Sequence, residues 1–505
     1  MVVGDDLCLQ PFEQTVFPGI GIEYDDVFPY CGRTALRRRS ALGKFLKQAG
    51  EGAAMRYSFP DDASMCRKRE ISRVVSLSMG NGLEYYNFVL YVFFAPFIGT
   101  TFFDLGPGSH TLLPALIAFG SGFLFRPLGA FVMGRMAAKR GEMPVLVLTF
   151  LLMGMASLGF VLLPGARRIG MLAPIMVFVF RAIQGFAEGG EIGPATQMLY
   201  ATSTGRRQVA NATMQYITQY VASLVAALVG TLVSVLFPEG ALADWGWRLP
   251  FLIGSLVAVI GLRLRVGQAI RPQDRVGAAP VRMKNLSASN EGADVFSWTT
   301  AALILCVVSA SALATYVRSF GVSYAMGQLH ATAFTSLVAM TVGIAAGLAA
   351  MITGIALYHR VSRRLILLGT IIATELSVLP VYLICIRHPS LPTLLLLNSV
   401  TYWLSGITSA ISIMTILRAI PAERRSLLFG MLYTMAVSVF GGLAQPVMEW
   451  SIDHTGWLLL PAFTTMLASP IGLVALLVLL GRSQEPPVSR VSDRCRGQGW
   501  EELVP

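Results

Sequence analysis

Charged and amide side chains occur inside several long apolar runs of this 505-residue chain. A charge at the centre of a lipid bilayer costs about 2.5–3.5 kcal/mol, so each such residue needs a partner or a function. Many of them recur three, four or seven residues apart, which places them on one face of a helix. They are Asn81, Glu84 and Asn87; Arg126; Arg181, Gln184, Glu188 and Glu191; Asn211, Gln215 and Gln219; and Arg318.

The run around Arg181 is compatible with two kinds of chemistry. Glu188 and Glu191 follow the arginine by seven and ten residues, on the same stripe of one helix. One interpretation is an internal ion pair of Arg181 with either carboxylate, which would neutralise the charge whatever the function. The other is a binding site in which the guanidinium takes a substrate carboxylate. Gln215 and Gln219 pose the same choice, between bonds to neighbouring helices and bonds to a substrate.

Glu84 favours a functional interpretation. It has no cation near it in the sequence, so inside a membrane it would take up and release a proton readily. Glu375 also stands alone in a later run, and the sequence assigns it no role.

The elements that must position these residues are membrane-spanning helices. Lys and Arg collect in cytoplasmic loops, and here the connectors between apolar runs are alternately rich and poor in them, apart from Arg167, Arg168 and Arg387. The alternation predicts about twelve spans with both termini in the cytoplasm. Each span needs about 20 mostly apolar residues. The expected spans are 74–100, 112–137, 145–164, 171–201, 209–237, 248–266, 299–326, 332–358, 365–386, 391–417, 427–452 and 457–480.

A long polar connector divides these spans into two sets of six. We therefore expect a flexible cytoplasmic tail at 1–70, a six-helix bundle at 71–266, a cytoplasmic central loop at 267–298, a second bundle at 299–481 and a cytoplasmic tail at 482–505. Basic loops follow both the second and the eighth span, which indicates an internal duplication.

Composition excludes several functional classes. Hydrophobic residues make up 54% of the chain and charged residues 13%, so lipid must be the main solvent. The net charge of +11 is scattered over short loops, which favours anionic lipid headgroups over nucleic acid as its partner. The chain has no phosphate-binding loop, no HExxH and no plausible Ser-His-Asp set, so it is not expected to be an enzyme. The cysteine spacing predicts neither a disulfide nor a zinc site, and no cofactor or metal is expected.

Five strings, in family order, resemble the metabolite:proton symporter family of the major facilitator superfamily. They are GNGLEYYNF at 80–88, GFLFRPLG at 122–129, RAIQGFAEGGEIG at 181–193, WGWRLPF at 245–251 and FGGLAQ at 440–445. The resemblance implies an all-α membrane protein with twelve transmembrane helices in two six-helix bundles, related by pseudo-two-fold symmetry around a central cavity. It also implies alternating-access uptake of a small organic acid, or of a zwitterion such as proline or betaine, with protons across the inner or plasma membrane.

The resemblance also suggests roles for individual residues. Arg126 and Arg181, with Arg318 from the opposite half, would bind a substrate carboxylate, and neutral hydrogen bonds would come from Gln184, Gln215 and Gln219. Glu84 is the first candidate for the proton carrier and Glu191 the second. The expected partners are a small-molecule substrate, protons and the lipid bilayer, and we expect a monomer.

Three positions depart from the family pattern. Asn87 stands where the family has an aspartate, and Ala138 and His359 stand where the loops after the second and eighth spans have an acidic residue. In the family these loops form a charge clasp that balances the inward and outward states. The departures leave two alternatives open: an uncoupled or efflux carrier on the same fold, and a non-transporting sensor.

Overall fold

The computed structural model describes residues 81–82, 85–104, 106, 111–140, 142–190, 192–201, 205–256, 259, 297–421 and 424–482. Glu84 and Glu191, the two candidate proton carriers, lie outside the described residues. So do the tail expected at 1–70, nearly all of the central loop at 267–298 and all but the first residue of the tail at 482–505. Within the described ranges the chain forms helices and their connections, with no strand.

We define the first half as the described residues up to 259 and the second half as those from 297. The first half contains α4 (Ala95–Phe102), α5 (Leu112–Leu124), α6 (Arg126–Arg140), α7 (Glu142–Leu162), α8 (Ala166–Ile169), α9 (Leu172–Gly189), α10 (Ile192–Ala201), α11 (Gly205–Leu236), α12 (Glu239–Asp244) and η1 (Gly246–Arg248). The second contains α14 (Trp298–Ser319), α15 (Gly321–Gly327), α16 (Ala333–Tyr358), α17 (Arg363–Arg387), α18 (Leu391–Ala419), α19 (Arg425–Ala436), η4 (Val437–Gly441), α20 (Gly442–Thr455) and α21 (Leu460–Arg482).

Each of the twelve expected spans has a helical counterpart among the described residues. Within the described ranges, nine helices are long and apolar enough to cross a bilayer, and the bent pair Tyr85–Phe93 and Ala95–Phe102, with 70° between its parts, gives a tenth when it is counted as one span. A shorter apolar helix, Val147–Leu162, lies at the third expected span, and helical residues 249–256 lie at the start of the sixth. The expectation of an all-α membrane protein is confirmed.

Several spans are interrupted where the sequence disfavours a continuous helix. Pro96 in α4 and Pro127 in α6 each fall in the first turn of a new helical segment, where the missing N–H costs nothing. The eleventh span contains the π-helical turn η4, immediately before Gly442. The break at Phe125 places Arg126 at the start of α6.

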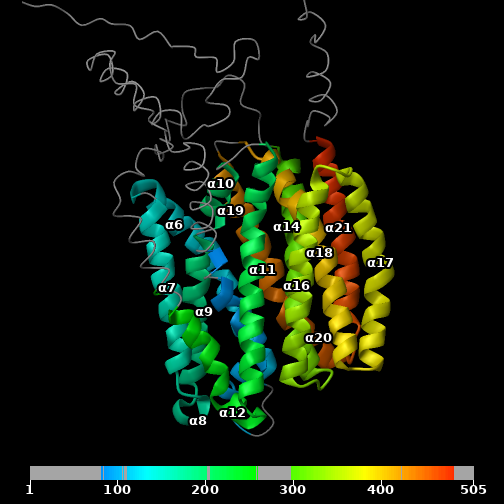
Figure 1. Ribbon diagram of the computed structural model, residues 1–505. Coiled ribbons are helices and arrows are strands. Elements are labelled where there is room, and N and C mark those ends of the chain that lie inside the picture. The colour runs from blue at the N-terminus through cyan, green and yellow to red at the C-terminus, as the bar shows by residue number, and fades with distance from the viewer. Residues whose placement is uncertain are drawn as a thin grey trace, which may run out of the picture. The chain divides into compact units, whose positions relative to one another are not determined.

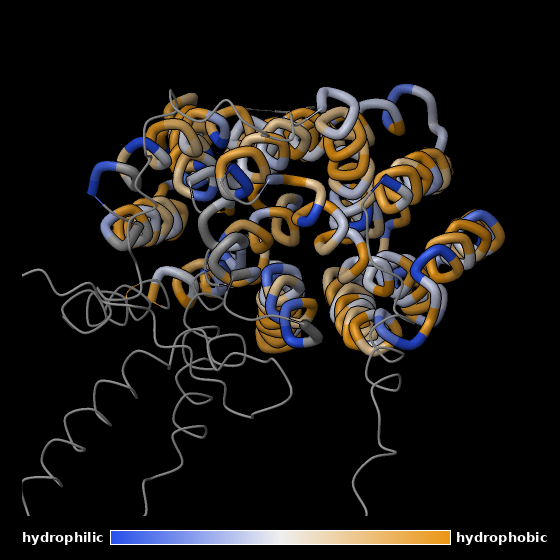
Figure 2. Tube along the Cα trace, turned by 90° about the horizontal axis from the view of Figure 1, so that it is seen from above, coloured by the Kyte–Doolittle hydropathy of each residue, from blue (hydrophilic) through white to orange (hydrophobic). Residues whose placement is uncertain are grey.

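The helices run between two ends of the molecule (Figure 1). We call one the basic end, because the connections and first helical residues there include Arg360, Arg363, Arg424 and Arg425, and the other the α8–α12 end. Seen from the basic end, the helix bodies are largely hydrophobic and the hydrophilic stretches lie mainly in the connections (Figure 2). Between the two halves, α5 packs on α20, α11 on α16 and α10 on α19. At the α8–α12 end, Arg167, an exception to the loop-charge rule, forms an ion pair with Asp104 at 3.0 Å.

Glycines bring α5 and α6 unusually close to α9. A Cβ atom added at Gly185 would overlap the carbonyl oxygen of Gly122, and one added at Gly189 would overlap that of Arg126. Small residues of this kind allow the backbones of membrane helices to touch. Polar side chains on these two spans can therefore meet directly.

Gly185→Ala is expected to destabilise the protein, because the added methyl group has no room against Gly122. Overpacking typically costs about 1–3 kcal/mol, so the melting temperature of the purified chain in detergent should fall by several degrees. Gly134→Ala on α6 is the control, since nothing lies within 4 Å of its Cβ position. Equal melting temperatures for the two variants would show that α5 and α9 are not in close contact.

Candidate substrate cavity

A cavity of about 190 Å³ lies between the two halves. Pockets for drug-sized ligands occupy about 300–1,000 Å³, so this volume suits a small metabolite. Among its described lining residues, Glu188 and Arg318 carry charge. Six tyrosines also contribute to the lining: Tyr85, Tyr216, Tyr220, Tyr316, Tyr402 and Tyr433.

Glu188 connects the cavity wall to a buried arginine of the neighbouring span. Its Oε2 accepts a hydrogen bond of 2.7 Å from Nη2 of Arg126, and 2% of the Arg126 side chain is exposed. The guanidinium also lies over the ring of Phe123, at 3.9 Å from the centroid. Removing one partner of a buried ion pair costs about 3–5 kcal/mol, because the other charge is left uncompensated.

The other carboxylate considered for an ion pair with Arg181, that of Glu191, lies outside the described residues. Arg181 does not form an ion pair with Glu188. Its Nη1 instead donates to Oε1 of Gln184 at 2.7 Å, and its side chain lies against the rings of Tyr91 and Phe119. The reason is distance along the helix, since seven residues rise by about 10.5 Å whereas three bring side chains together. With 1% of its surface exposed, Arg181 lies behind the cavity wall.

A cluster of aromatic rings from both halves surrounds the two buried arginines. Phe123 and Tyr316 meet edge to face at 5.1 Å, and Phe88 packs on Phe119 at 4.9 Å. Of these four rings, Tyr316 lines the cavity. A guanidinium held over a desolvated ring gains about 2 kcal/mol, so the cluster stabilises Arg126 in its buried position.

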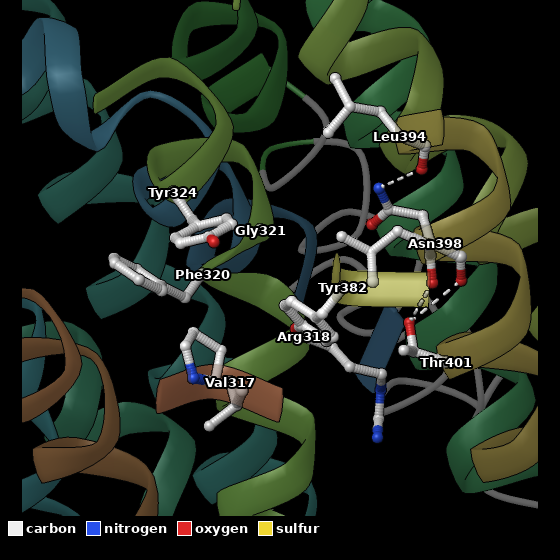
Figure 3. Close-up of a pocket in the computed structure, with 11 residues that line it drawn as sticks. Val317, Arg318, Phe320, Gly321, Tyr324, Tyr382, Leu394, Asn398 and Thr401 are labelled. Carbon is white, nitrogen blue, oxygen red and sulfur yellow. Dashed lines mark hydrogen bonds between the residues drawn. The ribbon is translucent and has the colours of Figure 1, made fainter. Parts of the chain in front are cut away.

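Arg318 is the cation of the cavity wall in the second half. Its Nη2 donates to Oγ1 of Thr315 at 3.0 Å, and its guanidinium carbon lies 5.5 Å from the centroid of the Tyr402 ring. No carboxylate of the described residues lies within 4 Å of it. Arg318 also borders a second cavity of about 10 Å³ with Asn398 and Thr401 (Figure 3), which has room for about one water molecule.

Amides of the first and fifth spans bond to each other. Nε2 of Gln215 donates to Oδ1 of Asn81 at 2.8 Å, and Nδ2 of Asn81 donates to the Gln215 carbonyl at 3.0 Å and to Thr218 at 2.9 Å. Nδ2 of Asn87, at the position of the family aspartate, donates to the Gly254 carbonyl at 3.4 Å. These contacts join helices of the first half.

Proteins of known function resemble the chain over most of its length, although no protein-family model matches it. It is 29% identical over 418 residues to the citrate-proton symporter of Klebsiella pneumoniae, covering 82% of this chain and 92% of that protein. The xylose transporter XylE from E. coli, in an inward open conformation, superposes with a TM-score of 0.60 over 84% of this chain and 99% of that chain, at 12% identity. The chain has the major facilitator superfamily fold. The solved structure supports the fold alone, and the sequence relative supports a resemblance to metabolite:proton symporters.

Further relatives of the chain differ in the solutes that their names specify. The alpha-ketoglutarate permease of Escherichia coli K12 is 29% identical over 390 residues, covering 75% of this chain and 87% of that protein. The proline/betaine transporter of the same organism is 25% identical over 415 residues, covering 79% and 81%. Organic acids and zwitterions are thus both represented among the relatives.

The structure places the expected site residues in three groups. Gln219 and Arg318 line the cavity, and Arg126 meets its wall through Glu188. Arg181, Gln184 and Gln215 are buried outside its lining. Glu84 and Glu191 lie outside the described residues.

Sequence reasoning missed much of the cavity lining in the second half. The wall there is rich in hydroxyl side chains from α14, α17, α18 and α21: Ser311, Thr315, Thr370, Thr374, Thr401, Ser405, Thr408, Ser412, Thr465 and Ser469. Several donate back to their own helix, as Thr374 does to the Thr370 carbonyl and Thr465 to the Pro461 carbonyl. Uncharged hydroxyls are common in membrane helices, so their number alone gave no signal.

Proposed function

We propose that this transporter is a proton-coupled symporter of a small organic acid, a dicarboxylate, a tricarboxylate or a similar acid, across the inner or plasma membrane by alternating access. The observation that carries the proposal is Arg318, a buried guanidinium in the wall of the cavity with no carboxylate within 4 Å among the described residues. An arginine so placed favours an anionic ligand, and the bidentate contact with a carboxylate is the strong form of that interaction. The relatives named for citrate and alpha-ketoglutarate support the same class of substrate.

Glu188 and Arg126 offer a way to couple substrate to protons. Ionised Glu188 forms an ion pair with the guanidinium of Arg126, and protonation of Glu188 would break this pair and free the guanidinium. A second substrate carboxylate could then bind Arg126, so that proton and substrate enter the cavity together. Glu84 and Glu191 remain proposed proton carriers from the sequence, and Arg181, Gln184 and Gln215 are proposed to hold this side of the cavity in place.

Alternating access requires contacts between the halves to break at one end at a time. At the basic end, Arg425 lies over the ring of Tyr200 at 4.6 Å. Towards the α8–α12 end, the hydroxyls of Thr231 and Thr341 are 3.3 Å apart. We propose that these contacts open alternately and that the basic end faces the cytoplasm with both termini.

A zwitterion is the second candidate, and one feature of the cavity favours it. Six tyrosines surround a space with Glu188 in one wall and Arg318 in another. Aromatic rings bind quaternary ammonium groups through cation–π contacts, so a betaine could place its ammonium among the rings and its carboxylate at Arg318.

Uptake into proteoliposomes of the full chain distinguishes these candidates. With the outside more acidic, citrate or 2-oxoglutarate should accumulate about tenfold per pH unit for one co-transported proton, and a protonophore should abolish the accumulation. Preferential uptake of proline or betaine would select the zwitterion. Uptake that does not depend on the pH gradient would select a facilitative carrier, and binding without flux would select a sensor.

Glu84→Gln should abolish accumulation, and undiminished accumulation in this variant would remove Glu84 as the proton carrier.

A further inference from the structure

Glu449 on α20 is a buried carboxyl with an incomplete set of hydrogen bonds. It is 3% exposed, and its Oε2 has no hydrogen-bond partner among the described residues. Its Oε1 accepts a long bond of 3.4 Å from Nε2 of Gln328, and the same amide nitrogen donates to Oδ1 of Asp453 at 3.0 Å. One amide group therefore serves two carboxyls that lie four residues apart on one helix.

Glu449 lies outside the lining of both cavities, where α20 meets α15 and the first half. Its neighbours in sequence, Met448 and Ile452, belong to an apolar cluster with Leu116 of α5. A Cβ atom at Gly327 would lie 3.3 Å from Leu112, so α15 and α5 touch as well. These helices must separate if the α8–α12 end is to open.

The electrostatic surroundings of Glu449 offer little compensation for a negative charge. Of the elements packed on α20, α5 and η4 carry no titratable group, α14 carries Cys306, Tyr316 and Arg318, and α21 carries Arg482 at its far end. The other titratable groups on neighbouring segments are Tyr324 on α15, His330 just after α15, and Asp453 and His454 on α20 itself. Arg318 is bonded to Thr315, and its side chain borders both cavities.

We propose that Glu449 is a second proton-binding site, which holds a proton while the α8–α12 end is closed and releases it when that end opens. In the closed arrangement an ionised Glu449 would be a buried charge beside Asp453 with one unpartnered oxygen, a state that is strongly disfavoured. When the helices separate, water solvates the carboxylate and the proton leaves. Closure then takes up one proton from the compartment at that end. Because opening returns the proton to the same compartment, Glu449 controls the opening of this end and carries no proton across the membrane. The inference rests on the proposed function only in that this end opens and closes during alternating access.

The test measures opening by double electron–electron resonance and needs no substrate. Spin labels are placed at Thr100→Cys in the first half and Trp457→Cys in the second, both exposed at the α8–α12 end, in the full chain lacking its native cysteines. The fraction of molecules with a long distance between the two spin labels should rise with pH. In Glu449→Gln the distance between the labels should stay short at every pH. Asp453→Asn should shift the midpoint to lower pH, by on the order of one unit, because a like charge beside Glu449 is removed.

Glu375→Gln is the matched control, since this carboxyl on α17 also has a buried oxygen without a partner among the described residues. It should keep the pH profile of the parent. Distances in the parent that do not change with pH, or an unchanged profile in Glu449→Gln, would overturn the inference. Should Glu449→Gln fail to fold, an Asp453→Asn midpoint equal to that of the parent would overturn it instead. The parent chain could also show no proton-driven uptake while its label distances still change with pH as expected. That result would count against the proposed function and would leave the Glu449 proposal unaffected.

Discussion

Replacing Arg318 by Gln is expected to weaken binding of an anionic substrate by at least about 30-fold. Truncating one partner of a buried charged contact costs about 2–5 kcal/mol, and each 1.4 kcal/mol is tenfold in affinity. Arg318 is 7% exposed in the wall of the cavity, so the carboxylate it binds is largely removed from water. Isothermal titration of the purified chain with citrate or 2-oxoglutarate measures the change directly.

Two further variants make this prediction specific. Arg318→Lys keeps the charge but loses the planar fork of donors, so its affinity should fall between those of the parent and Arg318→Gln. Arg387→Gln removes an exposed arginine at the end of α17 and should leave the affinity unchanged. Equal affinities in the parent and Arg318→Gln would place the substrate elsewhere.

Glu188→Gln is expected to destabilise the protein by about 3 kcal/mol or more, because Arg126 remains as an uncompensated buried cation. Arg126→Gln should cost a similar amount at neutral pH. The stability loss caused by Arg126→Gln should become smaller at acidic pH, because the remaining Glu188 can then be protonated. The stability loss caused by Glu188→Gln should not change in this way. The double variant should recover most of the lost stability, giving a coupling energy well above the 0.5 kcal/mol expected of independent sites. Thermal unfolding in detergent at two pH values provides the four stabilities.

The same pair has a predicted transport phenotype. Glu188→Gln should exchange substrate across the membrane but fail to accumulate it against a gradient, because the proton-dependent release of Arg126 is lost. Additive effects of the two single substitutions on stability would show that the 2.7 Å contact is not a strong ion pair. Normal accumulation by Glu188→Gln would remove this residue from the coupling.

The positions of the spans could be predicted from the sequence because hydropathy and loop charge reflect a strong constraint of the bilayer. The interruptions inside spans were harder to predict. Pro127 offered a signal for the break before α6, whereas the π-helical turn at Val437–Gly441 depends on contacts with the first half, such as the bond from Ser438 to the Phe123 carbonyl at 2.8 Å.

The site could be predicted in its residue types and less well in its pairings. Arg126 and Glu188 are 62 residues apart in the chain, and their meeting depends on the glycine contacts between α5, α6 and α9. Gly185 and Gly189, four residues apart beside Glu188, were the available signal for that close packing. The tyrosines of the lining come from both halves, so no spacing within one helix could identify them together.

A cryo-EM structure of the full chain with the organic acid that it accumulates would show directly whether Arg318 binds the substrate. We predict a substrate carboxylate within hydrogen-bond distance of the Arg318 guanidinium, inside the cavity that Glu188 and Tyr402 also line. A substrate bound away from this cavity, or bound inside it with Arg318 still bonded to Thr315 alone, would contradict the role proposed for Arg318.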